Sequence, residues 1–211
     1  MGFFDRNRQQ LAARGIDPAR LPPGQYVTDR FPVLHAGGVP DYPSLDGWTL
    51  ELSGLVAGPV TLTWAQLLDL PSVEVVVDIH CVTKWSKLDT RWQGVAVETL
   101  LEQAGGAAPG ATHVLGHAEH GFSANVPLAD CLGVDDRGRP RAMVAYAYDG
   151  QPLDPEHGYP ARLLVPHLYF WKSPKWLRGI ELLPADQPGF WERNGYHMYG
   201  DPFREQRFSG D

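Results

Sequence analysis

The chain has 211 residues, of which 43% are hydrophobic, and this is enough for one large domain or two small ones with a proper core. The net charge of −7 argues against nucleic acid as the default partner, because binding to phosphate backbones depends on Lys and Arg. The two cysteines allow at most one disulfide, so the sequence does not indicate a disulfide-stapled secreted scaffold.

The N-terminal region is polar and rich in proline. We expect residues 1–27 to form an arm and residues 28–211 to form a single domain, because no low-complexity stretch divides the chain. The N-terminus lacks the apolar segment of a secretion signal, and no stretch of the chain reaches the length of a membrane span. A cytoplasmic protein with no membrane span is the simplest expectation.

The first half of the chain predicts two strands and two short helices. Residues 48–53 alternate apolar and polar side chains, as a half-buried strand does. Thr63 has the capping-box spacing at the start of a helix, which Pro71 ends. Residues 73–81 form an apolar strand, and residues 97–104 form a helix that two glycines terminate.

The second half of the chain is predicted to be rich in strands, and the whole to fold as a mixed α/β (α+β) domain with mixed sheets and few short helices. No long βαβ unit and no G-x-G-x-x-G motif is present, which disfavours a dinucleotide-binding fold. The expected strands cover residues 112–117, 122–126, 142–148, 162–165 and 179–183.

The C-terminal segment after Pro184 has no clear period but a high density of aromatic residues. Such a composition is unlike that of a free tail. We therefore expect this segment to wrap around the core or a second subunit. Its aromatic residues are Phe190, Trp191, Tyr196, Tyr199, Phe203 and Phe208.

Cys81 closes an apolar strand and is followed at once by a polar, aromatic-rich segment that is expected to be a loop. A thiol in this position can present its sulfur to a cavity while its backbone stays fixed, as a soft-metal ligand or a nucleophile requires. A small buried core residue is the competing interpretation, and local sequence leaves both open. For Cys131, which lies in a short apolar piece, the core interpretation is favoured.

Two basic segments indicate an anion site. His157 and Arg162 flank a turn rich in glycine and proline that leads into a strand, and Lys172, Ser173 and Lys175 follow about ten residues later. Cations with small residues between them can hold a phosphate. A solvated basic loop would have the same sequence, but both segments flank one apolar run and are therefore expected to converge.

Three histidines, His113, His117 and His120, form a further cluster. Two of them share a face of a predicted strand, which would suit a zinc site with nitrogen ligands. No Cys or Glu stands at the usual spacing, so scattered surface histidines are the preferred interpretation.

Five motifs in order resemble the molybdopterin-binding catalytic domain of the sulfite oxidase family, and most closely its short stand-alone bacterial members. The resemblance covers roughly residues 28–208. Its motifs are Phe31–His35; Cys81 with Trp85-Ser86 and Trp92-Gln93-Gly94; Ala145-Tyr146 before Asp149-Gly150; His157-Gly158 through Pro166; and Lys172–Trp176.

This resemblance implies a mononuclear molybdenum held by a pterin dithiolene and by the thiolate of Cys81, with Tyr146 beside the metal in the substrate pocket. His80 would shape or protonate the substrate end. The implied cofactor-binding positions are Phe31, Val33, Leu34, His35, Cys81, His157, Arg162, Ser173, Pro174 and Lys175.

The departures from the family are informative. Sulfite oxidases carry an Arg, which helps bind the sulfite anion, where this chain has Val33. A buried anion without a cationic partner is unfavourable, so efficient sulfite oxidation is not expected. The haem domain of the animal enzymes has no counterpart, and we expect no haem and a separate electron-transfer partner.

The leading hypothesis is therefore a molybdenum–molybdopterin oxidoreductase that transfers an oxygen atom in a two-electron reaction on a small oxo substrate. Reduction of a sulfoxide or N-oxide at the same centre is the first alternative, and non-catalytic binding of molybdopterin is the second. A zinc-binding module ranks last. The sequence does not fix the oligomeric state.

Overall fold

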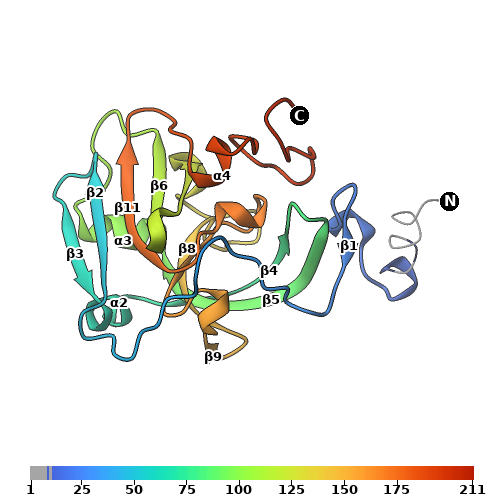
Figure 1. Cartoon of the computed structure of the whole chain (residues 1–211), viewed down its shortest axis with the longest axis horizontal. Helices are drawn as coiled ribbons and strands as arrows, with labels where there is room; N and C mark the ends of the chain where they lie inside the picture. The colour runs from blue at the N-terminus through green and yellow to red at the C-terminus, as the bar shows by residue number, and fades with distance from the viewer. Residues whose placement is uncertain (1–8, 10) are drawn as a thin grey trace.

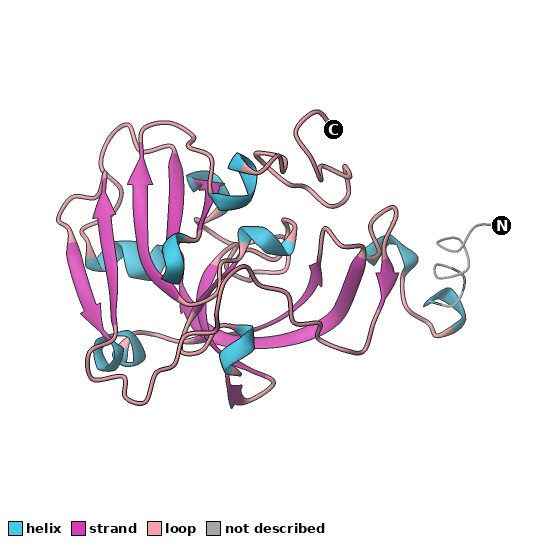
Figure 2. Ribbon diagram, in the orientation of Figure 1, coloured by secondary structure: helices cyan, strands magenta, loops and turns pink. Residues whose placement is uncertain are grey.

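The computed structural model describes residue 9 and residues 11–211. Two β-sheets with few short helices form the protein (Figures 1 and 2). The predicted mixed α+β architecture is therefore confirmed. Residues 1–8 and residue 10 of the predicted arm lie outside the described part of the chain.

The first sheet has five strands and lies on the left in Figure 1. The parallel pair β2 and β11 lies at its centre, and the remaining pairs are antiparallel. In the order β3-β2-β11-β6-β7, its strands are Val60–Thr63, Thr49–Gly54, Leu177–Leu183, His113–Ala118 and Ser123–Pro127.

The second sheet has six strands and is organised around β5, the longest strand of the chain. β5 pairs with β1, β4 and β8, while β8 also pairs with β9 and β10. These strands are β1 Tyr26–Val27, β4 Val73–His80, β5 Trp85–Ala96, β8 Met143–Tyr148, β9 Gln151–Pro152 and β10 Arg162–Leu164.

The helices are short and lie at the ends of strands. α2 (Trp64–Asp69) has the predicted capping box: Thr63 Oγ1 accepts from the backbone N–H of Gln66, and the Gln66 side chain accepts from the backbone N–H of Thr63. α3 (Val97–Gln103) ends in Gly105 at φ +73, as predicted. The others are α4 Phe190–Arg193 and the 3₁₀ helices η1 Pro18–Arg20, η2 Glu119–Gly121, η3 Leu128–Asp130, η4 Pro155–His157 and η5 Phe170–Lys172.

Two apolar clusters lie on opposite faces of the second sheet. The larger one contains side chains of the five-stranded sheet, α2, α3 and the inner face of β8 and β10. The smaller one contains alternate residues of β4, with Trp85 and Trp92 of β5 and Ala145 of β8. Because side chains alternate along a strand, β8 contributes Val144 to the first cluster and Ala145 to the second.

The loop expected after Cys81 is present but short, because β5 already begins at Trp85. Only four residues, Cys81 to Lys84, separate β4 from β5, so the two strands form a hairpin with Cys81 in its turn. The strand β5 was not predicted because its outward positions carry charged residues, which interrupt the apolar pattern. In addition, Asp89 adopts φ +54 at an irregular point of the β4–β5 ladder. A strand that pairs on both edges is stabilised by its neighbours more than by its own pattern.

The C-terminal segment folds over the core. Arg207 donates to the carbonyl oxygen of Val82 at 2.8 Å, and the ring of Tyr196 lies edge-on to that of Trp171 at 5.1 Å. Figure 1 shows this segment above η5 and the β4–β5 hairpin. Within the described part of the chain, none of the helices has the length and apolar character needed to cross a membrane.

A fully buried ion pair fixes the C-terminal segment to the core. Lys172 Nζ lies 2.6 Å from Glu192 Oε1, and neither side chain is exposed to solvent. Lys172 also donates to the backbone and side-chain oxygens of Asn125 on β7 and to the carbonyl oxygen of Met198. Glu192 accepts from Trp171 Nε1 at 2.7 Å. The pair thus joins η5, β7 and α4 in one buried polar network.

Replacing Lys172 with Met should leave the carboxylate of Glu192 buried without a cation. We expect the free energy of unfolding to fall by about 3–5 kcal/mol, measured by urea denaturation. Lys172→Met/Glu192→Gln should recover much of this loss, because no uncompensated charge remains and Trp171 keeps an acceptor. If Lys172→Met unfolds with the same urea midpoint as the wild type, this assignment is contradicted.

Candidate functional site

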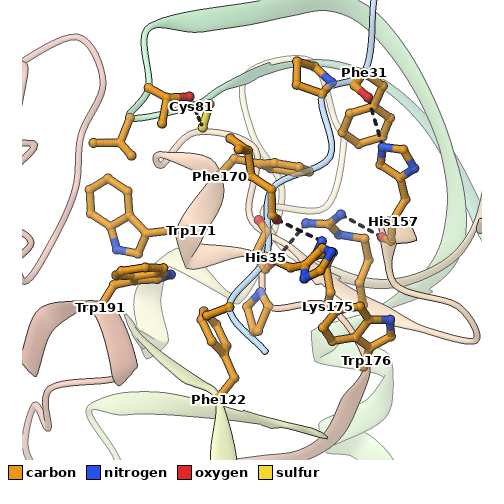
Figure 3. Close-up of a pocket in the computed structure, with 18 of the residues that line it drawn as sticks. Phe31, His35, Cys81, Phe122, His157, Phe170, Trp171, Lys175, Trp176 and Trp191 are labelled. Carbon is orange, nitrogen blue, oxygen red and sulfur yellow. Dashed lines mark hydrogen bonds between the residues drawn. The ribbon is translucent and has the colours of Figure 1, made fainter. Parts of the chain in front are cut away.

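A cavity of about 280 Å³ lies where the β4–β5 hairpin, η5, β10 and the C-terminal segment meet. Figure 3 shows Cys81 at one side of this cavity and His157, His35 and Lys175 at the other. Nine of the predicted site residues line it: Phe31, Leu34, His35, Cys81, His157, Arg162, Ser173, Pro174 and Lys175.

The hairpin holds Cys81 rigidly and directs its sulfur to the cavity. The backbone N–H of Cys81 donates to Trp85 O at 2.8 Å, and its carbonyl oxygen accepts from Gln25 Nε2 at 3.1 Å. The residue is 8% exposed, and Thr83 Oγ1 donates to its Sγ at 3.2 Å. Burial raises the pKa of the Cys81 thiol, although the Thr83 hydroxyl acts in the opposite direction. This thiol is therefore a poor free nucleophile and is suited to exchange its proton for a metal.

Arg162 lies beneath the opposite side of the cavity and is fully buried. Its guanidinium donates to His157 O at 2.9 Å and to Ser173 O at 2.7 Å, and it stacks over the Phe170 ring at 4.1 Å. Its Nε has no hydrogen-bond partner among the described residues. Burial lowers the pKa of Arg162, but an arginine remains charged at neutral pH. Arg162 thus offers a desolvated positive charge to an anion.

Lys175 supplies a second cation beside the first. Its Nζ donates to the carbonyl oxygens of Leu34 and Glu156, at 2.9 and 2.7 Å. Burial, together with the charge of Arg162, lowers the pKa of Lys175 to about 7. Neither Lys175 nor Arg162 forms a salt bridge with any residue the structure describes. Two adjacent cations, one buried and one half-buried, are unfavourable without a carboxylate or a bound anion.

The predicted histidines complete this basic side of the cavity. His157 donates to Phe31 O at 3.2 Å, and its ring centroid lies 3.9 Å from that of Phe31. His35 donates to Gly37 O at 2.9 Å and faces the edge of the Trp176 ring. Ser173 Oγ accepts from the backbone N–H of Val165, which fixes the loop that carries Lys175.

Gly158 permits the two basic segments to approach each other. Its φ is +116, and a Cβ at this position would lie 3.1 Å from the Cβ of Arg162 and 3.2 Å from the Cβ of Lys175. A side chain here would push the His157 turn away from both cations. The convergence predicted from the sequence therefore depends on a glycine at this position.

The cavity next to Cys81 is walled by aromatic rings that the sequence did not single out as site residues. They are Phe122, Trp171, Trp191 and Tyr196. Figure 3 shows Trp171 and Trp191 on the Cys81 side of the cavity and Phe122 farther away, below His35. The aromatic crowding of the C-terminal segment was the available signal for Trp191 and Tyr196, but it did not reveal which rings face the site.

Tyr146, predicted to lie in the substrate pocket, is not among the residues that line the cavity. On β8 it points to the same side as Val144, into the larger apolar cluster, where its ring lies edge-on to Trp64 at 6.2 Å. Residue alternation places Ala145 on the side of the smaller cluster, which also contains Cys81.

His80, predicted to act at the substrate end, does not line the cavity either. Consecutive residues of a strand face opposite sides of the sheet, so His80 points away from the cavity that Cys81 lines. Its Nδ1 is paired with Ser86 Oγ at 2.8 Å, and its ring faces Phe203 in a separate hollow. Burial lowers the pKa of His80 to about 4, so it stays neutral.

Val33 does not line the cavity either, and 39% of it is exposed. The predicted contact of Val33 with the cofactor is therefore not seen, whereas Phe31, Leu34 and His35 on the same segment do line the cavity.

The three histidines considered for zinc do not form a metal site. His117 pairs with Glu181 at 2.8 Å, and His113 lies 3.9 Å from Asp186. Among the described residues, no group of three or more His, Cys, Asp or Glu side chains is arranged to hold a metal ion. Cys131 is 1% exposed and belongs to the larger apolar cluster, as predicted.

The donor set fits molybdopterin and its metal. A polarisable metal already bound by sulfur prefers a thiolate, which Cys81 can provide. The anionic phosphate of a pterin cofactor would satisfy Arg162, whose Nε lacks a partner in the described chain, and Lys175. The fold and the site therefore define a protein that holds a metal cofactor between one thiol and one anion cradle.

Comparison with known proteins identifies the family. The sequence model described as the oxidoreductase molybdopterin binding domain matches residues 36–191. The chain belongs to this sulfite oxidase-type family and is a molybdenum-dependent oxidoreductase.

Three relatives illustrate the range of this family. The chain is 50% identical to the uncharacterized oxidoreductase YuiH of Bacillus subtilis, over 99% of this chain and all of the relative. It is 34% identical to the protein-methionine-sulfoxide reductase catalytic subunit MsrP of Gluconobacter oxydans, over 72% of this chain but only 52% of the relative. The sulfane dehydrogenase SoxCD of Paracoccus pantotrophus has the same fold, with a TM-score of 0.62 and 24% identity over 72% of this chain and 41% of that one.

Replacing Cys81 with Ser tests the metal ligand. Because the anion cradle is untouched, we expect the purified variant to keep the pterin but to lose one sulfur from the coordination of molybdenum. Turnover should fall by more than about 100-fold. Loss of a metal ligand should have a larger effect than loss of a residue that only hydrogen-bonds to a ligand, which typically costs about 10- to 100-fold. Metal analysis, X-ray absorption and steady-state kinetics of protein from a molybdenum-replete host measure this. A variant with wild-type metal geometry and turnover would exclude Cys81 as the ligand.

The depressed pKa of Lys175 predicts a specific pH dependence. In cofactor-free protein, the folded state releases the Lys175 proton near pH 7, whereas the unfolded state keeps it to about pH 10. The unfolded state therefore binds more protons in this window, and stability should rise with pH from about 7 to 10. Urea denaturation at several pH values should show this slope, and Lys175→Met should flatten it. An unchanged slope in that variant would contradict the assignment.

Proposed function

We propose that this protein reduces a small, uncharged sulfoxide or N-oxide, and that it is not an efficient sulfite oxidase. In this reaction the S–O or N–O bond breaks, and the oxygen leaves as water after the uptake of two electrons and two protons. A separate electron-transfer partner supplies the electrons. The bound molybdenum cofactor supplies the two-electron oxygen-atom transfer, and the protein supplies ligation, orientation and exclusion of water.

One observation carries this proposal: the two cations that line the cavity and have no salt-bridge partner in the described chain, Arg162 and Lys175, lie away from Cys81. Arg162 and Lys175 lie with His157 and His35 at the side that suits the phosphate of the cofactor. The lining on the Cys81 side includes the rings of Trp171 and Trp191, which Figure 3 shows. Tyr196 packs against both of these rings. Sulfite is a dianion or monoanion near neutral pH and needs a cation beside the metal, whereas a neutral oxide does not.

Two of the relatives support the same direction of reaction. MsrP of Gluconobacter oxydans and the putative subunit YedZ1 of Azospira oryzae are both named for the reduction of protein methionine sulfoxide. This chain spans only about half the length of MsrP. We therefore take from these names only the chemical class of the substrate, an S-oxide. The cytoplasmic location and the absence of haem stay predictions from the sequence.

In this scheme the residues of the chain have distinct tasks. Cys81 Sγ, which accepts a hydrogen bond from Thr83, would coordinate the metal as a thiolate. Arg162, Lys175 and His157 fix the anionic end of the cofactor and so set its orientation. The aromatic wall excludes water from the reacting end, which strengthens the electrostatic interactions there.

A panel of substrates tests the proposal. Purified holoprotein should oxidise a reduced viologen dye with dimethyl sulfoxide, methionine sulfoxide or trimethylamine N-oxide as the acceptor. We expect kcat/KM for the best of these to exceed that for sulfite with ferricyanide by at least about 100-fold. Faster turnover of sulfite would contradict the proposal. A molybdenum centre that no oxide or sulfite oxidises or reduces would favour non-catalytic binding of the cofactor.

A further inference from the structure

Tyr196 lies in a part of the chain that the family comparison does not cover. The match to the molybdopterin-binding domain ends at residue 191, yet Tyr196 lines the same cavity as Cys81. The part of the C-terminal segment beyond residue 191 therefore adds Tyr196 to a wall to which the matched domain contributes Trp191. Tyr196 is the only tyrosine among the residues that line this cavity in the described structure.

The ring of Tyr196 is held in a fixed position. It packs at 5.1 Å from Trp171, 5.0 Å from Trp191 and 5.6 Å from Phe208, measured between centroids. Its backbone N–H donates to Trp191 O at 3.1 Å, and Tyr196 forms an isolated β-bridge with Phe208. A ring with three aromatic neighbours and a paired backbone has few alternative rotamers.

The buried ion pair described above supports this arrangement. Glu192, next to Trp191 in the chain, pairs with Lys172, next to Trp171. Glu192 also accepts from the indole N–H of Trp171. The two tryptophans that contact the Tyr196 ring are thus positioned by one polar network below the wall.

The hydroxyl of Tyr196 is available to a ligand. Within the described chain it makes no hydrogen bond to protein, unlike the other two side-chain hydroxyls that line the cavity. Thr83 donates to Cys81 Sγ, and Ser173 accepts from Val165 N–H. Burial and, to a smaller extent, the charge of Cys81 raise the pKa of Tyr196, which is consistent with the proximity of the two side chains.

We propose that Tyr196 binds the oxygen of the substrate: its O–H donates a hydrogen bond to the S–O or N–O oxygen, while the rings of Trp171 and Trp191 contact the apolar substituents. This inference rests on the proposed function and deepens it. The oxygen of a sulfoxide or N-oxide carries a large partial negative charge and is a good acceptor. The sulfur or nitrogen carries the complementary positive charge, which aromatic faces attract.

Tyr196 thereby takes the place that the sequence assigned to Tyr146. It reaches the site from the C-terminal segment, whereas Tyr146 lies in the apolar core. Because the C-terminal segment carries both Trp191 and Tyr196, it would determine which oxides fit the cavity.

The test compares Tyr196→Phe with Tyr199→Phe, both as holoproteins of measured molybdenum content. The phenyl ring of the first variant would keep the aromatic packing, so only the hydroxyl is lost. Tyr199 is on the same segment but lines a separate hollow, which makes it a matched control. Binding of dimethyl sulfone, an analogue with the same S–O acceptor, is followed by quenching of tryptophan fluorescence, and kinetics are measured with dimethyl sulfoxide.

We expect Tyr196→Phe to bind the sulfone about tenfold more weakly and to show a similar rise in KM, with little change in molybdenum content. Tyr199→Phe should match the wild type in both measurements. If wild type reduces sulfoxides and Tyr196→Phe binds the sulfone and turns over like wild type, the inference is wrong. If the wild type reduces no sulfoxide or N-oxide, the proposed function fails. The comparison of sulfone binding between the wild type and Tyr196→Phe still tests whether the Tyr196 hydroxyl binds an S–O oxygen, and equal binding would contradict the inference.

Discussion

The burial of Arg162 is the constraint on which the site depends. A guanidinium without a carboxylate partner, placed on Phe170 and bonded only to two carbonyl oxygens of the described chain, is unfavourable unless an anion completes its surroundings. Lys175 increases this demand, since burial and the neighbouring charge lower its pKa. A phosphate bound here would therefore contribute to the electrostatic balance of the fold as well as act as a ligand.

Lys172 is a second buried cation, but its charge is neutralised by a carboxylate of the protein and not by a ligand. Lys172 is compensated inside the protein by Glu192, and the network that includes Trp171 and Asn125 joins the C-terminal segment to β7 and η5. Arg162 therefore requires a bound anion, whereas Lys172 and Glu192 together stabilise the aromatic wall of the cavity. The β4–β5 hairpin carries Cys81 at a fixed position. The proposed metal ligand comes from the hairpin and the cations from residues 157–175, while the aromatic wall combines Phe122, Trp171 and two residues of the C-terminal segment.

The corrected assignments share one physical cause. Tyr146 and His80 lie on strands next to residues that do face the smaller cluster, and a shift of one residue moves a side chain to the other side of a sheet. The motifs located the strands correctly, as the positions of β4 and β8 confirm. Which side of each strand faces the site is decided by the sheet that packs against it, and a motif does not contain that information.

Local patterns in the amino-acid sequence were sufficient to locate the thiol, the basic segments and most of the strands. Each of these depends on neighbouring residues: an apolar run ending in Cys81, a Gly–Pro turn beside Arg162, and a capping box at Thr63. That the tyrosine hydroxyl at the cavity belongs to Tyr196 became evident only from the folded chain. It depends on long-range packing of the C-terminal segment against η5 and on the direction in which each strand presents its side chains, and neither follows from residues near in sequence.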